Sequence, residues 1–535
     1  MIQFDQGKLR TTLKNLGYYS DKDDFKGICW GFSVAAMNAC YSGELKKFED
    51  RLQYMNDHPD LAGEVANINI KSIQDKIKNH VALTDQETKD KESYDKYIDV
   101  KAFCESMVSP QKRPYAIYGE YIFQENEKFF PLVQSKAMEE KGGLVIIDNT
   151  VNVYTPMGLT DYFKKLSESF NHNEDIVLRI TSSQQHTIDV FFDSEKGFCH
   201  IIDANLGVYG CHLNNKGLDT NSAEWLAKEI CNDAYYMGHA APIGSNDQFM
   251  LNIMVAAPQD KKSQIESIYN DFKETDAYKN AELITPEKAH FLDVGKKNQI
   301  SLAMFAVQHD CAKEVKELHK LGINLNNQTY LIDAAELNAT NAARALHEEG
   351  ANLNARFLKD MTVIGSTMAH IAARQNNVDM LRVLDECHVN LNKICLDISL
   401  LDIGKKPIDM AKEKIPTYKN DSAVQFILSV NHRDKLLKKC DDLEKRLHAG
   451  EKETINTLKK DIIDDWKNHD KNNQHAIFNK EDGWKGEIER TKTEIVVARK
   501  EKIEEKVKEK NKPDCAKDSN IEAEAMVKDT PRKTL

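Results

Sequence analysis

Residues 27–40 read GICWGFSVAAMNAC, an almost unbroken apolar run with a cysteine, Cys29, near its start. A run this apolar predicts a helix that is buried on every side, as the central helix of a domain is. A thiol at a helix N-terminus is stabilised as the thiolate, which is the nucleophilic form. Gly27 and Gly31 are expected to leave room for a substrate backbone. Cys29 is therefore predicted to be a nucleophile.

A histidine and an aspartate far downstream complement this cysteine. Residues 180–210 predict two antiparallel strands joined by a turn at 193–197, with a second turn at Asn205 and Gly207. His186 lies near the start of one strand, and Asp203 lies 203 − 186 = 17 positions later, near the end of the next. The two side chains are expected to lie side by side, so that the carboxylate fixes the tautomer and orientation of the imidazole.

The residues GICWG at a helix start, HTIDV at 186–190 and DANLG at 203–207 resemble the Yersinia outer-protein-T type cysteine proteases. That papain-like group occurs among bacterial effectors delivered into host cells. The resemblance rests on these short segments of residues 1–270. It implies an α+β papain-like cysteine protease-like domain over 1–270, with Cys29 as nucleophile, His186 as general base and acid, and Asp203 as the orienting group.

One position departs from that resemblance. Enzymes of this group carry Gln or Asn five or six residues before the cysteine to bind the oxyanion, whereas Asp24 and Asp23 stand there in this chain. A carboxylate aimed at a developing oxyanion opposes catalysis, and the loss of one donor typically costs about a hundredfold or more in rate. Asn15 or Gln6 is the expected substitute donor. Two alternatives stay open: a working thiol hydrolase, or a catalytically degenerate protein that acts only by binding.

Composition limits the remaining function classes. A chain of 535 residues predicts two to four domains, and no stretch reaches the ~18 to 20 apolar residues of a membrane span. The N-terminus has no conventional secretory signal. Eleven cysteines without repeated spacing indicate free thiols in a reducing compartment. The net charge of −12 disfavours direct nucleic-acid binding, so the expected partners are proteins.

No cofactor or metal is expected. Two adjacent Cys-His pairs, Cys199 with His200 and Cys211 with His212, suggest zinc at first sight. Neighbouring residues on a strand point to opposite faces, and the spacing of paired zinc ligands is absent. The pattern therefore predicts structural residues at these four positions.

The rest of the segment 1–270 predicts an α+β domain with an insertion. Residues 61–106 are charged and have helical periodicity, which predicts a helical insertion at about 60–140. Strands are expected after Lys141, at 175–182 and at 248–257, with a helix from Trp225 to Met237. A helical linker is expected at 271–299.

Residues 300–430 carry an internal repeat. The segment GSTMAHIAARQNNVDMLRVLDECHVNLN at 365–392 resembles the ankyrin repeat, with Met368 in place of the usual Pro. Equivalent asparagines end three units: the step from Asn326 to Asn354 is 354 − 326 = 28, and the step from Asn354 to Asn392 is 392 − 354 = 38. The resemblance predicts an all-α stack of about four ankyrin repeats, with a hairpin insertion near 355–366.

Ankyrin stacks bind proteins, so the long hairpin is the expected partner surface. His370 occupies a position where ankyrin repeats use a hydrogen-bonding histidine at a helix start, and it is expected to be structural. The predicted partner-binding residues are Arg356, Phe357, Lys359, Met361 and Val363.

The chain ends in charged helix. Residues 431–510 predict a helical hairpin or coiled coil, and residues 511–535 predict a disordered tail. The order of these parts resembles the ankyrin-repeat effectors of Legionella and its relatives, most closely the ankyrin H type. That resemblance implies a virulence protein exported by type IV secretion into the host cytoplasm, with the nucleus as an alternative, where it binds a host protein.

Overall fold

The computed structural model describes residues 2–3, 6–18, 29–112, 134–170, 174–183, 186–234, 244, 247–294, 299–357, 365–395, 405–418, 422–445, 452–471, 488, 490–493 and 495–497. The chain divides into two compact units, Met1–Ile427 and Leu428–Leu535, which are described separately. The finer domain boundaries expected within the first unit stay predictions.

The first part of unit one is built on an antiparallel sheet of seven strands, in the order β1-β6-β5-β4-β3-β7-β2. Neighbours in this order pair antiparallel throughout. The strands are β1 (Ile2–Gln3), β2 (Leu144–Tyr154), β3 (Ile176–Ser182), β4 (Thr187–Asp193), β5 (Phe198–Asp203), β6 (Gly207–His212) and β7 (Phe249–Pro258).

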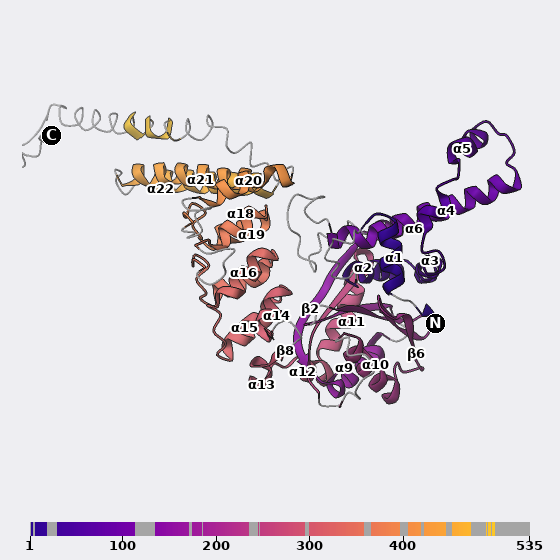
Figure 1. Ribbon diagram of the computed structural model, residues 1–535. Helices are drawn as coiled ribbons and strands as arrows, with labels where there is room; N and C mark the ends of the chain where they lie inside the picture. The colour runs from indigo at the N-terminus through magenta and orange to yellow at the C-terminus, as the bar shows by residue number, and fades with distance from the viewer. Residues whose placement is uncertain are drawn as a thin grey trace, which may run out of the picture. The chain divides into compact units, whose positions relative to one another are not determined.

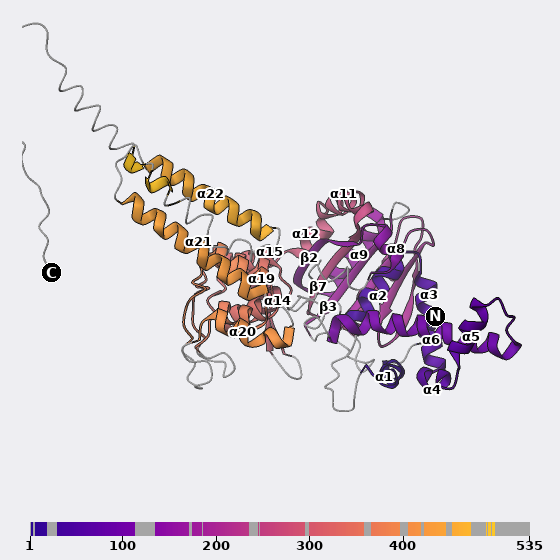
Figure 2. The same cartoon turned by 90° about the horizontal axis from the view of Figure 1, so that it is seen from above.

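The sheet is covered on both faces. Every residue of β3, β4 and β7 is buried, which requires a layer on each side of these central strands. Helix α2 (Cys29–Tyr41) packs on β3, β4 and β5. Figures 1 and 2 show α2 on one side of the strands and a group of helices on the other. That group is α9 (Pro156–Phe170), α10 (Thr220–Ala234), α11 (Lys262–Lys273) and α12 (Asp276–Glu282).

Further helices surround α2. Apolar side chains of α6, such as Phe103 and Met107, are buried beside α2, whereas α5 has a single buried residue, Ile73. The mainly exposed α5 and the first half of α6 extend from the sheet domain (Figure 1). These helices are α1 (Gln6–Asn15), α3 (Leu45–Asp57), α4 (Leu61–Val65), α5 (Ile70–Lys78), α6 (Asp85–Lys112) and α8 (Lys136–Glu140).

Successive helix pairs follow the sheet domain. Each helix packs on the equivalent helix of the next pair: α14 on α16, α16 on α18, α15 on α17, α17 on α19. A short helix and a two-stranded hairpin precede them, α13 (Pro286–Ala289), β8 (Leu292–Val294) and β9 (Gln299–Ser301). The pairs are α14 (Leu302–Gln308) with α15 (Ala312–Lys320), α16 (Gln328–Glu336) with α17 (Thr340–Glu348), and α18 (Met368–Arg374) with α19 (Val378–Glu386). Helix α20 (Pro407–Tyr418) packs on α18, and α21 (Ser422–Glu444) follows α20 in the chain.

The turn inside each of these three pairs has the same backbone geometry. Asp310, Asn338 and Asn376 adopt left-handed conformations, with φ of 58°, 55° and 59°. Their spacings, 338 − 310 = 28 and 376 − 338 = 38, equal those found between the repeated asparagines in the sequence. The internal repeat predicted from the sequence is therefore a repeat of helix pairs.

The repeated asparagines also connect consecutive pairs. The backbone N–H of Asn352 donates to Oδ1 of Asn326 at 3.1 Å, and that of Asn390 donates to Oδ1 of Asn354 at 3.0 Å. These bonds satisfy backbone donors in the loops and set the register of one unit on the next.

His370 is structural, as expected. Its Nδ1 lies 3.1 Å from the backbone N and 2.9 Å from Oγ1 of Thr367, so it caps α18. Its Nε2 lies 3.3 Å from the carbonyl oxygen of Lys405. Burial lowers the pKa of His370 to about 4, so the ring is neutral.

The second unit contains an antiparallel helix pair. Trp466 Nε1 donates to Ser429 Oγ at 3.2 Å, and Lys459 Nζ lies 2.6 Å from Asp441 Oδ1. Ser429 precedes Asp441 on α21, whereas its partner Trp466 follows Lys459, the partner of Asp441. The two helices therefore run in opposite directions. The helices are the remainder of α21 and α22 (Lys452–Lys471). Within the described ranges, no helix has the length and apolarity needed to cross a membrane.

Candidate active site

Helix α2 places Cys29 at its first position. All thirteen residues of α2 are buried, and Cys29 is 7% exposed. The first four N–H groups of a helix have no acceptor within the helix, so the positive end of the helix dipole lies at this thiol. The apolar run predicted in the sequence is thus a central helix with its cysteine at the N-terminal end.

Gly31 allows α2 and α6 to pack closely. A Cβ added at Gly31 would lie 1.9 Å from the backbone oxygen of Met107 on α6. The absence of a side chain therefore lets α6 approach α2, and the expectation that Gly31 makes room for a substrate backbone is wrong. Gly27, which carried the same expectation, lies outside the described residues.

The His186 ring lies between the other two predicted catalytic residues. Its Nε2 is 3.1 Å from Oδ1 and 3.2 Å from Oδ2 of Asp203, and both residues are buried. The ring also has a hydrogen bond with the thiol of Cys29. Because Nε2 faces Asp203, Nδ1 is the nitrogen that remains for the sulfur. The structure thus brings together Cys29, His186 and Asp203.

Asn205 is a further member of the site that the sequence analysis assigned only to a turn. Its backbone N–H donates to Asp203 Oδ1 at 2.6 Å, and its side-chain nitrogen lies 3.1 Å from His186 Nε2. Since Nε2 carries the proton donated to Asp203, the amide fits best with its oxygen turned toward the ring. The sequence feature that could have identified Asn205 is its position two residues after Asp203, at the turn between two strands.

The electrostatics of the site keep His186 protonated. Burial alone lowers the pKa of this imidazole, but hydrogen bonds and charge interactions with Asp203 and Cys29 outweigh burial and raise the pKa to about 10. The ring is therefore an imidazolium at neutral pH. The site therefore places a positively charged ring beside the Cys29 side chain.

A buried ionic cluster holds α2 against the strand that follows His186. Arg179 of β3 and Asp189 of β4 are both 0% exposed and directly opposite in register. Arg179 Nε donates to Ser33 Oγ at 2.8 Å, and Ser33 Oγ donates to Asp189 Oδ1 at 2.6 Å. The Arg179 guanidinium also lies over the Trp30 ring, 5.1 Å from its centroid. Ser33 is one helical turn after Cys29, so this clamp fixes the cysteine relative to the histidine strand.

The expected oxyanion donors receive no support from the described residues. Asp23 and Asp24 lie outside those residues, as does the side chain of Gln6. Asn15 donates its side-chain N–H to the carbonyl of Pro59 at 2.8 Å, which engages it before α4.

The predicted partner-binding residues fall in three environments. Phe357 is 0% exposed, and its backbone pairs with Ser366 at 3.0 Å, so its side chain belongs to the core and is not presented to a partner. Arg356 is half-buried and donates to the carbonyl of Ile394 at 3.2 Å. Lys359, Met361 and Val363 lie outside the described residues.

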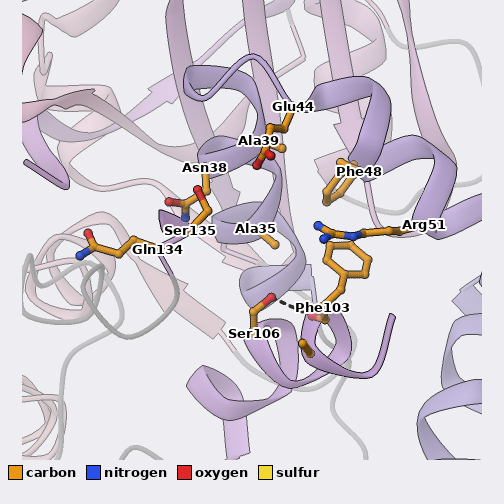
Figure 3. A pocket seen from close by; sticks show the side chains of 11 residues that line it. Ala35, Asn38, Ala39, Glu44, Phe48, Arg51, Phe103, Ser106, Gln134 and Ser135 are labelled. Carbon is orange, nitrogen blue, oxygen red and sulfur yellow. Dashed lines mark hydrogen bonds between the residues drawn. The ribbon is translucent and has the colours of Figure 1, made fainter. Parts of the chain in front are cut away.

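A cavity of about 190 Å³ lies beside α2, away from the sulfur. Ala35, the lining residue nearest to Cys29 in sequence, is six residues on, which is about 9 Å along the helix. Figure 3 shows Phe48, Arg51 and Phe103 on one side of the cavity and Asn38, Gln134 and Ser135 on the other. Arg51 is paired with Asp99 at 2.9 Å. The lining therefore offers aromatic surface, and its cation is already neutralised.

No metal-binding cluster of three or more His, Cys, Asp or Glu occurs within the described ranges. His200 packs between the rings of Phe191 and Phe198, 5.6 and 4.6 Å from their centroids. Cys199 lies instead opposite Cys211 on the neighbouring strand. Within the first Cys-His pair, the cysteine and the histidine thus contact different neighbours.

Comparisons with known proteins are sparse. No family model matches this chain. No curated protein matches it. Among solved structures, the crystal structure of the Pseudomonas avirulence protein AvrPphB aligns with 45% of this chain and 99% of its own, at 10% identity and a TM-score of 0.20. A likeness this distant supports no conclusion by itself, so any function assigned to the chain rests on the geometry of the site.

Proposed function

We propose that the sheet domain is a papain-like thiol hydrolase, most simply a protease, with Cys29 as nucleophile and His186 as acid and base. One observation carries this proposal: a single buried imidazole has hydrogen bonds with both the Cys29 thiol and the Asp203 carboxylate. Each group has a role in acyl transfer, and the ring is charged at neutral pH.

Acylation follows from the protonation state of the pair. The Cys29 thiolate attacks the substrate carbonyl carbon, and the developing oxyanion needs hydrogen-bond donors. His186 then transfers its proton to the leaving amine, which departs as a neutral product. Asp203 and Asn205 hold the ring in place during the transfer.

Deacylation depends on a change in the pKa of the same imidazole. In the free enzyme the sulfur contributes to the raised pKa of His186 through a hydrogen bond and its charge. An acylated sulfur has neither this hydrogen bond nor this charge, so the pKa of the His186 ring falls and the ring can accept a proton from water. The hydroxide attacks the thioester, and the acid product leaves with Cys29 restored. Deamidation, transglutamination and acyl transfer to another nucleophile use the same acyl-enzyme.

The repeated helix pairs are proposed to be an ankyrin-type stack that binds a host protein. The repeat of left-handed turns, at spacings that match those of the repeated asparagines, supports this part of the proposal. Half-buried Arg356 beside the 358–364 segment is a proposed contact. Delivery by a type IV route into the host cytoplasm is proposed from the sequence resemblance, and a translocation reporter fused to the chain tests it.

A second candidate function is binding without catalysis. Asp23 and Asp24, which precede Cys29 where an oxyanion donor is expected, favour it. In that case the sheet domain and the helix pairs form a docking surface for a host protein, and the Cys29 site has no turnover.

Alkylation of Cys29 distinguishes the two functions. Labelling by iodoacetamide is followed by peptide mass spectrometry from about pH 4 to 9, in wild type and in His186→Ala. The readout is the midpoint of the pH dependence, because Cys29 is only 7% exposed and its absolute rate is limited by access. The partly exposed Cys387 in the same molecule is the internal reference.

The hydrolase proposal expects Cys29 to label with a midpoint well below that of Cys387, and expects His186→Ala to move the midpoint up to the ordinary thiol range, near pH 8.5. If Cys29 and Cys387 follow the same curve and His186→Ala changes neither, the pair is not poised for chemistry. That result leaves the binding function.

A further inference from the structure

Two cysteines face each other across the hairpin that holds Asp203. Cys199 of β5 and Cys211 of β6 are direct partners in the antiparallel register, and both are free thiols. Directly opposed residues place their side chains on the same face, with Cβ atoms typically about 4.5 to 5.5 Å apart. The pair is therefore arranged as the two halves of a cross-strand disulfide would be.

The Cα spacing expected for this pair fits a disulfide. Leu213 N donates to Gly197 O at 2.8 Å, which marks a hydrogen-bonded pair two positions along the ladder from the pair of Cys199 and Cys211. The alternation of an antiparallel ladder makes the cysteines a hydrogen-bonded pair as well, whose Cα atoms are typically about 5.5 Å apart. Disulfides most often span about 5.5 to 6 Å between Cα atoms and about 3.5 to 4.5 Å between Cβ atoms. The Cα spacing thus matches, and closure of the bond requires the two Cβ atoms to approach by about 1 Å.

A glycine beside the pair permits close contact of the strands. A Cβ at Gly210 would lie 1.8 Å from the backbone oxygen of Cys199. Any side chain at this position would push β6 away from β5. Gly210 thus keeps the neighbouring thiols together.

The two thiols differ in access and in reactivity. Cys199 is 0% exposed, whereas Cys211 is partly exposed. A hydrogen bond from Cys199 lowers the pKa of Cys211, while burial raises that of Cys199. Cys211 is suited to react first with a reagent in solution, and Cys199 is suited to react second from within the protein.

We propose that Cys199 and Cys211 form a redox site that closes to an intramolecular disulfide when it meets a low-molecular-weight disulfide such as oxidised glutathione. The Cys211 thiolate attacks one sulfur of the oxidant, whose S–S bond breaks and releases one glutathione thiol. Cys199 then attacks the Cys211 sulfur of the mixed disulfide and releases the second glutathione. Two protein S–H bonds are lost, one S–S bond forms, and the two protons leave on two glutathione thiols.

This site acts on the candidate active site through the ring it closes. The ring from 199 to 211 contains Asp203 and Asn205, the two residues that contact His186 Nε2. A disulfide restrains the turn between them. The proposal does not depend on hydrolase activity, because it concerns only the chemistry of the two thiols.

Peptide mass spectrometry tests the proposal on the full chain. Both cysteines fall in one tryptic peptide, residues 197–216, between Lys196 and Lys216. The folded protein is treated with oxidised glutathione, unreacted thiols are blocked with iodoacetamide, and the protein is then denatured and digested. The expected product is this peptide without alkyl groups and lighter by two hydrogens. Prior reduction with dithiothreitol is expected to give the doubly alkylated peptide.

Two variants and an internal reference complete the test. In Cys199→Ala, Cys211 is expected to stop at the glutathione mixed disulfide, and in Cys211→Ser the buried Cys199 is expected to stay a thiol. Cys387, also partly exposed, reports that the oxidant was effective by carrying glutathione. If the wild-type peptide carries glutathione on Cys211 without the internal bond, or keeps both thiols while Cys387 has reacted, the proposal is overturned.

Discussion

Two buried carboxylates lie where the sheet domain meets the first helix pair. Glu282 ends α12 and is 7% exposed, and Glu314 of α15 is 3% exposed. Tyr154 O–H donates to Glu282 Oε1 at 2.6 Å. Burial raises the pKa of Glu282 to about 7 and that of Glu314 to about 8, and the charge of Glu282 adds to the second rise. The contact between these segments should therefore depend on pH.

The sign follows from proton linkage. Between pH 4.5 and 7 the folded chain holds a proton on Glu282 that the unfolded chain has released. Folding is therefore stabilised at acid pH, and stability falls as pH rises through this window. A rise in pKa from 4.5 to about 7 corresponds to about 3 kcal/mol, since each pKa unit is about 1.4 kcal/mol.

Glu282→Gln isolates this effect. The amide is neutral at every pH and its oxygen still accepts from Tyr154, so the packing is kept while ionisation is removed. Near pH 5 the variant should be within about 1 kcal/mol of the wild type, and at pH 8 it should be more stable by up to about 3 kcal/mol. The pKa of Glu314 should also fall, because one charge that raises it is gone.

Urea unfolding followed by circular dichroism at pH 5 and pH 8 measures the effect. Glu266→Gln, half-buried on α11, is the matched control and should show no such gain. Tyr154→Phe removes the donor to Glu282 and should lower stability more at pH 8 than at pH 5. A Glu282→Gln variant that is no more stable than wild type at pH 8, or that differs equally at both pH values, would refute the reasoning.

Three further substitutions probe the site. Gly31→Ala should destabilise the fold by about 1 to 3 kcal/mol, because the new Cβ overlaps the α6 backbone, and urea unfolding measures this. Arg179→Met should cost about 3 to 5 kcal/mol at pH 8, since it leaves the buried Asp189 without its cation, and should cost less near pH 5, where that carboxyl is protonated; its pKa is already about 7. Asn205→Ala should keep the fold, judged by circular dichroism, but slow Cys29 alkylation at pH 6 by weakening the hold on the His186 ring; unchanged alkylation would contradict that role.

The sequence predicted the parts of the site that depend on local pattern. An apolar run that starts at Cys29 identifies a buried helix, and alternation around His186 and Asp203 identifies strands that meet at a turn. Asn205 was not predicted to be a site residue, because asparagine side chains in turns usually form hydrogen bonds with the nearby backbone. Arg179 was missed within an apolar strand, yet Arg179 and Asp189 are direct partners in the register of β3 and β4, which are consecutive strands. Pairing these two strands as a hairpin would have placed the two residues opposite each other.

Features that depend on packing between distant parts of the chain could not be predicted from the sequence. The unequal spacings of the repeated asparagines were visible because each unit repeats the same local geometry. The proximity of Glu282 and Glu314 was not visible, because neither lies in a repeated pattern and their environment comes from a strand more than a hundred residues earlier, which carries Tyr154. The role of Gly31 likewise required the position of α6.

The buried clamp explains why the fold and the site cannot vary independently. Cys29 and Ser33 lie one turn apart on α2, and His186 and Asp189 are three residues apart in the chain. Ser33 and Asp189 are joined at 2.6 Å inside a cluster that is almost completely shielded from solvent. A buried charge pair costs desolvation energy and adds little net stability, but it tolerates little displacement of its partners. Any shift of α2 along β4 that separates the clamp also moves the sulfur from the imidazole. The buried clamp is therefore a contact that fixes the distance on which the proposed chemistry depends, although its net contribution to stability is small.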